Sequence, residues 1–131
     1  MNELTVRTKR RCEMLDITAD VRKTVRESAV SGGICHVFVP HTTAGLTINE
    51  NADPDVVRDI ERHMSKLVPE DGGYSHGEGN SDGHIKSSLF GASLALIVEG
   101  GDIVLGQWQA VYFCEFDGPR TRKVYIKTVK G

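Results

Sequence analysis

Residues 107–129, QWQAVYFCEFDGPRTRKVYIKTV, predict two β-strands separated by a tight turn. Aromatic and β-branched residues dominate 108–116 and 121–129, a composition that favours extended chain. Between these segments, DGPR at 117–120 contains the residue types that form turns. The stretch therefore joins two apolar strands through a polar turn.

Glu115 lies inside the first of these strands, among apolar residues. An unpaired carboxylate would be costly to bury there, so Glu115 needs a partner. Arg120 and Arg122, just beyond the turn, are the candidates. Arginine also recognises phosphate through two parallel hydrogen bonds. A buried ion pair and an anion-binding arginine are therefore both consistent with this pattern.

Further short strands are expected on the N-terminal side. Residues 94–106, LALIVEGGDIVLG, predict a hairpin that turns at residues 100–102. Extended segments are also expected at 34–40 and 46–50, and residues 4–16 predict one or two edge strands protected by lysine and arginine.

Two main helices are expected between the strands. The first begins at Thr18 as its cap and ends at Gly32-Gly33, and the second runs from Pro54 to about residue 67 with Asp53 as its N-cap. A short third helix is possible at 84–93. Helices inserted among many short antiparallel strands indicate an α+β fold with a sheet-rich core. The stripe of the second helix that we expect to be buried consists of Val56, Val57, Ile60, Met64 and Leu67.

Composition narrows the class of protein. The 131 residues fit one domain, 1–131, and a net charge of −2 without a basic run gives no indication of nucleic-acid binding. No apolar run is long enough to span a membrane, and the N-terminus lacks the apolar region of a signal peptide. Three scattered cysteines indicate buried thiols in a reducing compartment. We expect a cytoplasmic protein.

The polar stretch YSHGEGNSDGH at 74–84 is the centre of the predicted site. Its glycines favour irregular backbone, and we expect no helix or strand in it. Together with His41, its two histidines, His76 and His84, could supply the three protein ligands of a catalytic metal site. Each could instead be an ordinary surface or hydrogen-bonded histidine. His36, in a strand, and His63, on a helix, are interpreted as structural.

Further polar residues lie at the ends of predicted elements. Asn49 and Glu50 end a strand, and Asp59 lies on a helix, where each could act as a base or orient a ligand histidine. Asp59 could equally face solvent and pair with a neighbouring arginine. Thr43, with Thr42 beside it, could donate hydrogen bonds to an anion.

Several motifs resemble those of the YjbQ family, which is associated with a secondary thiamine-phosphate synthase activity. They are HTTAGLTINE at 41–50 with ADPDVVRD at 52–59, the His76 loop, SDGHIKSSLFG at 81–91, and LGQWQAVYFCEFDGPRTRKV at 105–124. The resemblance implies an α+β fold with a β-sandwich-like core of mostly antiparallel strands and two main helices, assembled as a homotrimer. Gly83 replaces the alanine usual in the family.

The resemblance also implies roles for individual residues. It moves Asp59 from the surface to the site and strengthens the metal interpretation of the three histidines. The implied catalytic residues are Glu50, Asp59, Asp82 and Glu115. The implied substrate-binding residues are Thr43, Asn49, Asn80, Asp117, Arg120 and Arg122, and the implied metal ligands are His41, His76 and His84.

The leading hypothesis is an enzyme that joins hydroxymethylpyrimidine diphosphate to thiazole phosphate and releases pyrophosphate. Arg120, Arg122 and a divalent metal, with zinc expected first, would stabilise the charge of the leaving group of this small phosphorylated substrate. Nickel, cobalt and iron suit three histidines as well. The alternatives are a metal-assisted hydrolase or phosphotransfer enzyme and a non-catalytic module that binds a small anion.

Overall fold

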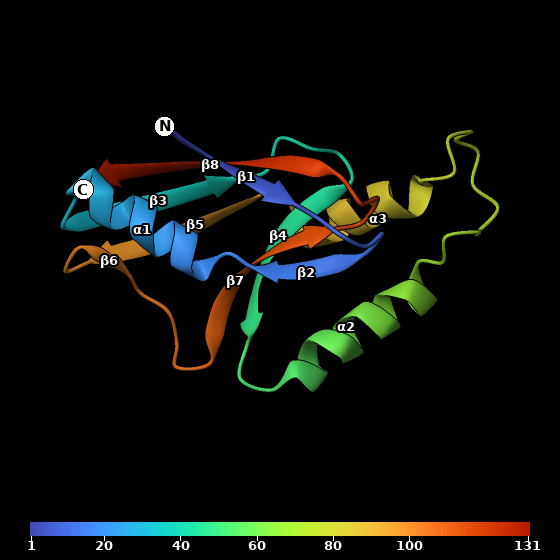
Figure 1. The fold of residues 1–131 in the computed structure, drawn as a ribbon, viewed down its shortest axis with the longest axis horizontal. Coiled ribbons are helices and arrows are strands. Elements are labelled where there is room, and N and C mark those ends of the chain that lie inside the picture. The colour runs from blue at the N-terminus through green and yellow to red at the C-terminus, as the bar shows by residue number, and fades with distance from the viewer.

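The computed structural model describes all 131 residues, which form two antiparallel sheets and three helices (Figure 1). In spatial order the larger sheet contains β1 (Asn2–Arg7), β8 (Thr121–Lys130), β3 (Gly32–Phe38), β5 (Ser93–Glu99) and β6 (Asp102–Ile103). The smaller sheet contains β2 (Glu13–Asp16), β7 (Gln109–Glu115) and β4 (Ala44–Glu50). The helices are α1 (Thr18–Ser28), α2 (Pro54–Leu67) and α3 (Ser81–Phe90). The predicted α+β class with antiparallel strands is confirmed.

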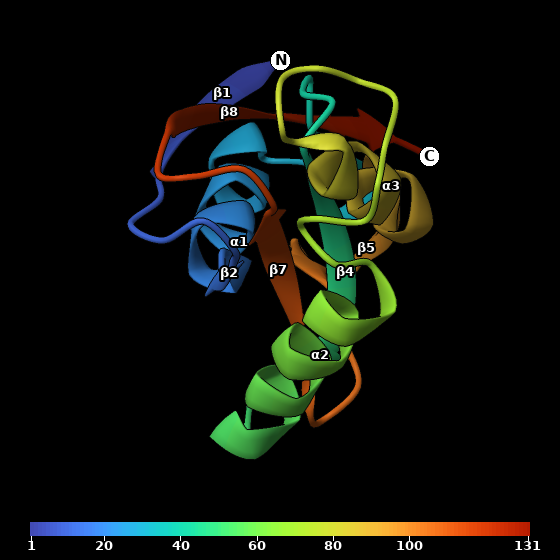
Figure 2. The same cartoon turned by 90° about the vertical axis from the view of Figure 1, so that its right-hand side faces the viewer.

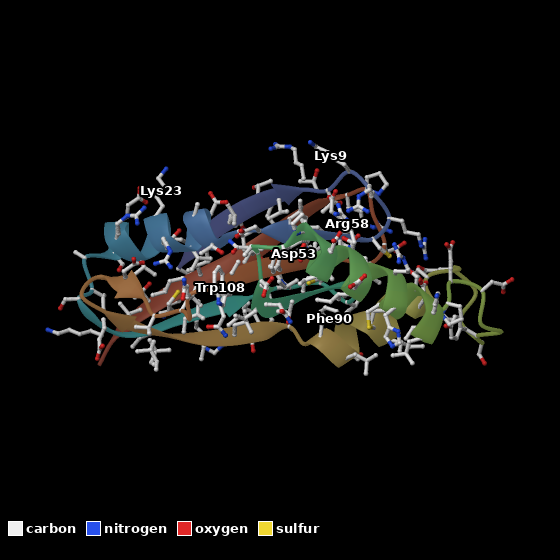
Figure 3. All side chains as sticks on the ribbon, turned by 90° about the horizontal axis from the view of Figure 1, so that it is seen from below. Lys9, Lys23, Asp53, Arg58, Phe90 and Trp108 are labelled. Atoms are coloured by element: carbon white, nitrogen blue, oxygen red, sulfur yellow. The ribbon has the colours of Figure 1, made fainter.

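The main core lies where the inner faces of the strands meet α1. Alternation along β3 buries Cys35 and Val37, and α1 contributes Val21 and Val25 to the same cluster. A smaller cluster lies on the other face of β7, where Phe90 of α3 packs on Phe116 with a ring-centroid distance of 5.0 Å. In Figure 3 the charged side chain of Lys23 extends outward from α1.

The boundaries of α1 differ from the prediction. Thr18 does not cap the helix; instead the Asp16 carboxylate accepts hydrogen bonds from the Thr18 backbone N–H at 2.9 Å and its hydroxyl at 2.6 Å. The helix ends at Ser28, followed by Ala29 in the left-handed region with φ 58°. Gly32 and its neighbour do not terminate α1 but begin β3, because the chain turns earlier than the glycines indicate.

The predicted start of α2 is confirmed, and its predicted stripe is confirmed in part, because four of the five stripe residues, Val56, Val57, Ile60 and Met64, are half-buried. Asp53 accepts the Asp55 N–H at 2.9 Å, and Pro54 occupies the first turn. No residue of α2 is fully buried in the single chain, and Leu67 is exposed. Figure 2 shows why: α2 extends away from the body of the molecule and only part of its length lies against the small sheet. Val57 packs on the smaller core cluster, whereas Leu67 has no apolar surface to cover it.

The third helix begins inside the stretch that was predicted to be irregular. The Asn80 carbonyl accepts the N–H groups of Gly83 at 3.0 Å and His84 at 3.3 Å, which starts α3 at Ser81. Asp82 and Lys86 then face each other one turn apart, with 3.3 Å between Oδ2 and Nζ. The prediction of no helix across 74–84 was therefore wrong for its last four residues.

The remaining strands agree with the prediction to within a few residues. The hairpin β5–β6 turns at Gly100 and Gly101, whose φ values of 61° and 76° suit glycine. All three cysteines are free, and two of them are buried. No helix in the structure has the length and apolar character required to cross a membrane.

Candidate functional site

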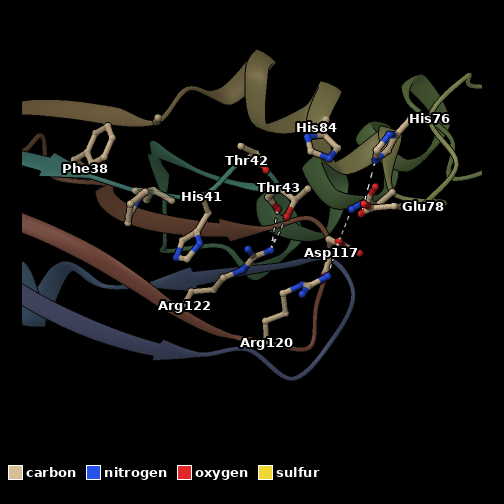
Figure 4. A pocket seen from close by; sticks show the side chains of 14 residues that line it. Phe38, His41, Thr42, Thr43, His76, Glu78, His84, Asp117, Arg120 and Arg122 are labelled. Carbon is tan, nitrogen blue, oxygen red and sulfur yellow. Dashed lines mark hydrogen bonds and ion pairs between the residues drawn. The ribbon is translucent and has the colours of Figure 1, made fainter.

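A cavity of about 710 Å³ opens at the end of the molecule where β4 begins and the β7–β8 turn lies (Figure 4). It collects residues from segments far apart in the sequence: the β3–β4 connection, the loop before α3, α3 itself and the turn that leads into β8. Eight of the residues predicted for the site line it: His41, Thr43, His76, Asn80, His84, Asp117, Arg120 and Arg122.

Arg122 is the most firmly positioned of these side chains. It is 5% exposed, and its Nε donates to Glu115 Oε1 at 2.9 Å while its Nη2 donates to Glu115 Oε2 and to Thr43 Oγ1 at 2.9 Å. Nη1 makes no hydrogen bond within the protein. Arg122 therefore combines a fixed geometry with one free donor nitrogen at the cavity.

Glu115 is the ion-pair partner of Arg122 rather than of Arg120. It is 0% exposed and also accepts the Thr8 hydroxyl at 2.8 Å and the backbone N–H groups of Phe116 and Asp117 at 3.1 Å. Burial raises the pKa of this carboxyl, but the hydrogen bonds from Arg122, Thr8 and Asp117 outweigh it and lower the pKa overall. A fully engaged carboxylate outside the cavity does not agree with the predicted catalytic role.

Arg120 is the more accessible arginine and pairs with Asp117. Its Nη2 lies 2.9 Å from Asp117 Oδ2, and its Nε donates to the Asp117 carbonyl at 2.7 Å. Asn80 Nδ2 donates to the same carboxylate oxygen at 3.0 Å. Burial raises the pKa of Asp117, but the hydrogen bonds from Asn80 and Arg120 outweigh this effect and lower the pKa overall. Asn80, Asp117 and Arg120 thus form one connected group on the cavity wall.

His41 is neutral and has a defined tautomer. Its Nε2 accepts the Lys123 backbone N–H at 2.9 Å, so in the neutral ring the proton is on Nδ1. Burial, and then the charge of Arg122, lower its pKa from the ordinary value of 6.5. His41 consequently offers an N–H donor rather than a lone pair, which disagrees with its predicted role as a metal ligand.

His76 and His84 form a separate pair. Their ring centroids are 5.5 Å apart in an edge-to-face arrangement, and Glu78 Oε2 lies 3.8 Å from His76 Nε2 (Figure 4). No group of three or more His, Cys, Asp or Glu side chains is close enough together to hold a metal ion. The three predicted ligands are therefore gathered around one cavity without being assembled into one metal site.

Asp82, predicted as catalytic, lies behind the cavity wall. It is 1% exposed and pairs with Arg11 at 2.8 Å and with Lys86, which is 3% exposed, at 3.3 Å. Because both oxygens bind cations inside the protein, the carboxylate has a structural role. Lys86 and Arg11 were missed by the sequence reasoning; the four-residue spacing of Asp82 and Lys86 would have indicated their pairing had the helix been recognised.

Three other predicted residues do not line the cavity. Thr43 precedes β4 at the cavity, whereas Asn49 and Glu50 lie at the opposite end of this strand. Seven residues of extended chain at about 3.3 Å each separate the two ends by roughly 20 Å. Asp59 is exposed on α2. Within one chain, these three residues cannot act on a molecule bound in the cavity.

Comparisons with known proteins agree with this fold and these motifs. The family model described as UPF0047 protein YjbQ-like matches residues 2–131. A UPF0047 protein of Methanocaldococcus jannaschii is 50% identical over 124 residues, covering 95% of this chain and 90% of that protein. The UPF0047 protein YugU of Bacillus subtilis is 49% identical, covering 97% of each chain.

Solved structures give the same result. A crystal structure of a YjbQ/UPF0047 family protein from Clostridium acetobutylicum matches with a TM-score of 0.97 and 53% identity, covering 98% of this chain and 100% of that chain. A YjbQ-like protein from Sulfolobus solfataricus matches with a TM-score of 0.95 at 29% identity. Sequence motifs, fold and close relatives coincide over nearly the whole length: the chain belongs to the YjbQ-like UPF0047 family.

Proposed function

We propose that this protein is a transferase of small phosphorylated substrates, which joins hydroxymethylpyrimidine diphosphate to thiazole phosphate and releases pyrophosphate. One observation carries the proposal: Arg122 Nη1, His41 Nδ1 and the guanidinium of Arg120 are unfilled or accessible hydrogen-bond donors around one cavity. Such donors bind phosphate oxygens and stabilise the charge that develops on a departing pyrophosphate.

The chain's own residues would act by positioning. Glu115 and Thr43 hold Arg122 in one orientation, so little side-chain entropy is lost when an anion binds. The Lys123 N–H keeps His41 in the tautomer that donates from Nδ1, and its lowered pKa keeps the ring neutral near pH 7. Asp117 holds Arg120 beside the cavity.

A divalent cation fits part of this arrangement. Each cavity arginine is already paired with a carboxylate, so the side chains offer donors but little net positive charge for a pyrophosphate. His76 and His84 are the two residues we propose would hold such an ion, zinc being the expected metal. Glu78 Oε2 lies 3.8 Å from His76 Nε2, and these three side chains do not form a preassembled group of ligands. When bound, the ion would act as a Lewis acid on the phosphate oxygens.

Arg120→Ala is expected to weaken binding of pyrophosphate about tenfold, because one charged hydrogen-bond donor is removed. Its effect on thermal stability should be small, since the side chain is 53% exposed. Titration calorimetry with pyrophosphate measures the affinity, and Arg7→Ala, which removes another exposed arginine without an ion pair, is the matched control. An unchanged affinity together with a lower melting temperature would make Arg120 a structural partner of Asp117.

His76→Ala and His84→Ala are each expected to lose bound metal while the protein stays folded, because neither ring is part of the apolar core. Elemental analysis of protein purified without chelator or affinity tag should give about one metal ion per chain in the wild type. His36→Ala, which removes an exposed histidine from β3, should leave the metal content unchanged. Retention of the metal in both cavity variants would exclude these ligands.

Measuring the products of turnover distinguishes the proposed transferase from the alternative functions. Incubation with both phosphorylated substrates should yield thiamine phosphate and pyrophosphate in equal amounts. Phosphate release from the diphosphate without any need for the thiazole would indicate a metal-assisted hydrolase. Affinity for the anion without any product would indicate a binding module.

We also propose that the chain assembles as a homotrimer. Ile34 on β3 lies between Ile97 on β5 and Val129 on β8, and all three apolar side chains are exposed on the outer face of the larger sheet. Burying such a contiguous patch favours self-association. Light scattering should give three times the 14.4 kDa chain mass, and a charged residue in place of Ile97 should give a smaller species.

A further inference from the structure

Arg10 and Arg11 are neighbours in the β1–β2 connection but bind different parts of the molecule. Arg10 pairs with Glu61 of α2 at 3.3 Å and with Glu13 at 3.5 Å. Arg11 points instead to the region behind the cavity. Its Nη2 lies 2.8 Å from Asp82 Oδ1, and its Nη1 lies 3.4 Å from Asp117 Oδ1.

Arg11 also binds both ends of the loop that connects α2 to α3. Its Nε lies 3.3 Å from Glu70 Oε1, and its Nη2 donates to the Gly79 carbonyl at 3.4 Å. The loop, residues 68–80, projects from the end of the molecule in Figure 1. It carries His76 and Glu78 to the cavity.

Very little else holds this loop. Within residues 69–79, the remaining hydrogen bonds and ion pairs are internal: the Tyr74 hydroxyl donates to the Pro69 carbonyl at 2.6 Å, and His76 faces Glu78. No other residue outside this segment makes a hydrogen bond or ion pair with it, and Asn80, which follows it, is held by Asp117. Nearly all of its residues are exposed, so apolar packing contributes little to its position.

We infer that Arg11 is a positioning residue for the candidate site: it fixes the loop that carries His76 relative to the turn that carries Arg120. The inference rests on the proposed function only in that the cavity must bind an anion. Through Asp117, the same guanidinium that holds the loop also orients Arg120, whose Nη2 binds the other oxygen of that carboxylate. One residue thus sets the distance between two walls of the cavity.

The experiment compares wild type with Arg11→Ala, Arg11→Lys and the matched control Arg10→Ala at a temperature well below unfolding. The first measurement is the rate at which a glutamate-specific protease cleaves the loop at Glu70 or Glu78, which reports how often the loop leaves its position. The second is the affinity for pyrophosphate by titration calorimetry.

In Arg11→Ala we expect cleavage to accelerate about tenfold and pyrophosphate affinity to fall about tenfold, because several charge-assisted hydrogen bonds are lost together. Arg11→Lys should restore thermal stability, since an ammonium can still neutralise Asp82, but it cannot reach Asp82, Asp117 and the loop at once. Its cleavage rate and affinity should therefore stay near those of Arg11→Ala. Arg10→Ala should behave as wild type in both measurements.

If Arg11→Lys has the same cleavage rate and the same pyrophosphate affinity as the wild type, the inference is overturned, because Arg11 then serves only to neutralise Asp82. If the wild type binds no pyrophosphate, the proposed anion site fails, and the cleavage rates alone decide whether Arg11 holds the loop.

Discussion

Glu115→Ala is expected to lower the free energy of unfolding by about 3–5 kcal/mol, because it leaves the buried guanidinium of Arg122 without its carboxylate. The same change removes the acceptor for the Thr8 hydroxyl and for two backbone N–H groups. For a chain of this length, the melting temperature should fall by roughly 10–20 °C. Urea unfolding at pH 7, followed by circular dichroism, measures the change.

The double variant Glu115→Leu/Arg122→Met is the control for this prediction. It removes both charges, so the cost of burying an unpaired ion disappears, and it should be more stable than Glu115→Ala. If the loss of unfolding free energy in the double variant equals the sum of the losses in the two single variants, Glu115 and Arg122 are not energetically coupled. The variant will not regain wild-type stability, because Thr8 and the N–H groups of Phe116 and Asp117 still lack an acceptor.

The same pair should make stability depend on pH. The pKa of Glu115 is lower in the folded protein than its ordinary value of 4.5, because the hydrogen bonds from Arg122, Thr8 and Asp117 outweigh the effect of burial. The unfolded chain therefore binds more protons, and the contribution of Glu115 is present above pH 4.5 and is lost as the pH falls below it. Glu115→Gln should flatten this part of the profile.

The pairing of Glu115 shows what local sequence can predict about structure. A carboxylate within an apolar strand had to find a cation, and two arginines stood just beyond the turn. The alternating pattern of β8 makes Arg122 point inward with Val124 and Ile126, whereas Arg120 precedes the strand and stays exposed. β8 begins at Thr121, where the strand was predicted, so the choice between the two arginines followed from the alternation along the strand, which puts Arg122 on the buried face.

The start of α3, by contrast, could not be predicted from local sequence. The glycines of residues 74–84 argued against a helix, yet Gly83 lies within α3. A β-carbon at this position would lie 3.0 Å from the Phe116 carbonyl and 3.3 Å from a Thr43 methyl carbon, so a small residue suits the close contact between α3 and the site. Tertiary packing, which is absent from local propensity, decided the conformation of these residues.

Sequence indicated which residues share the cavity most directly where a single turn holds them together. The β7–β8 turn brings Asp117 and Arg120 together, and both line the cavity. Asn49 and Glu50 follow Thr43 closely in sequence, but an extended strand carries them to its far end. Sequence proximity within a motif therefore did not correspond to spatial proximity in one chain.

A second large effect is expected at the buried pair in α3: Asp82→Ala should cost about 3–5 kcal/mol of unfolding free energy. Lys86 is 3% exposed and loses its only carboxylate partner in this variant, leaving the Cys12 thiol at 3.8 Å as the remaining hydrogen-bond partner of its ammonium group. Arg11 loses its shortest ion pair at the same time. Urea unfolding at pH 7 again measures the change.

Lys86→Met should cost much less, about 1.5 kcal/mol or below, although it breaks the same ion pair. Asp82 keeps Arg11 at 2.8 Å, and the methionine side chain has a similar length and joins the apolar surroundings formed by Met64, Phe90 and Phe116. The test is whether Asp82→Ala loses more unfolding free energy than Lys86→Met, because each variant removes one partner of the same ion pair. Equal losses would mean that Arg11 cannot keep Asp82 satisfied alone, and they would also weaken the case that Arg11 is rigid enough to hold the loop.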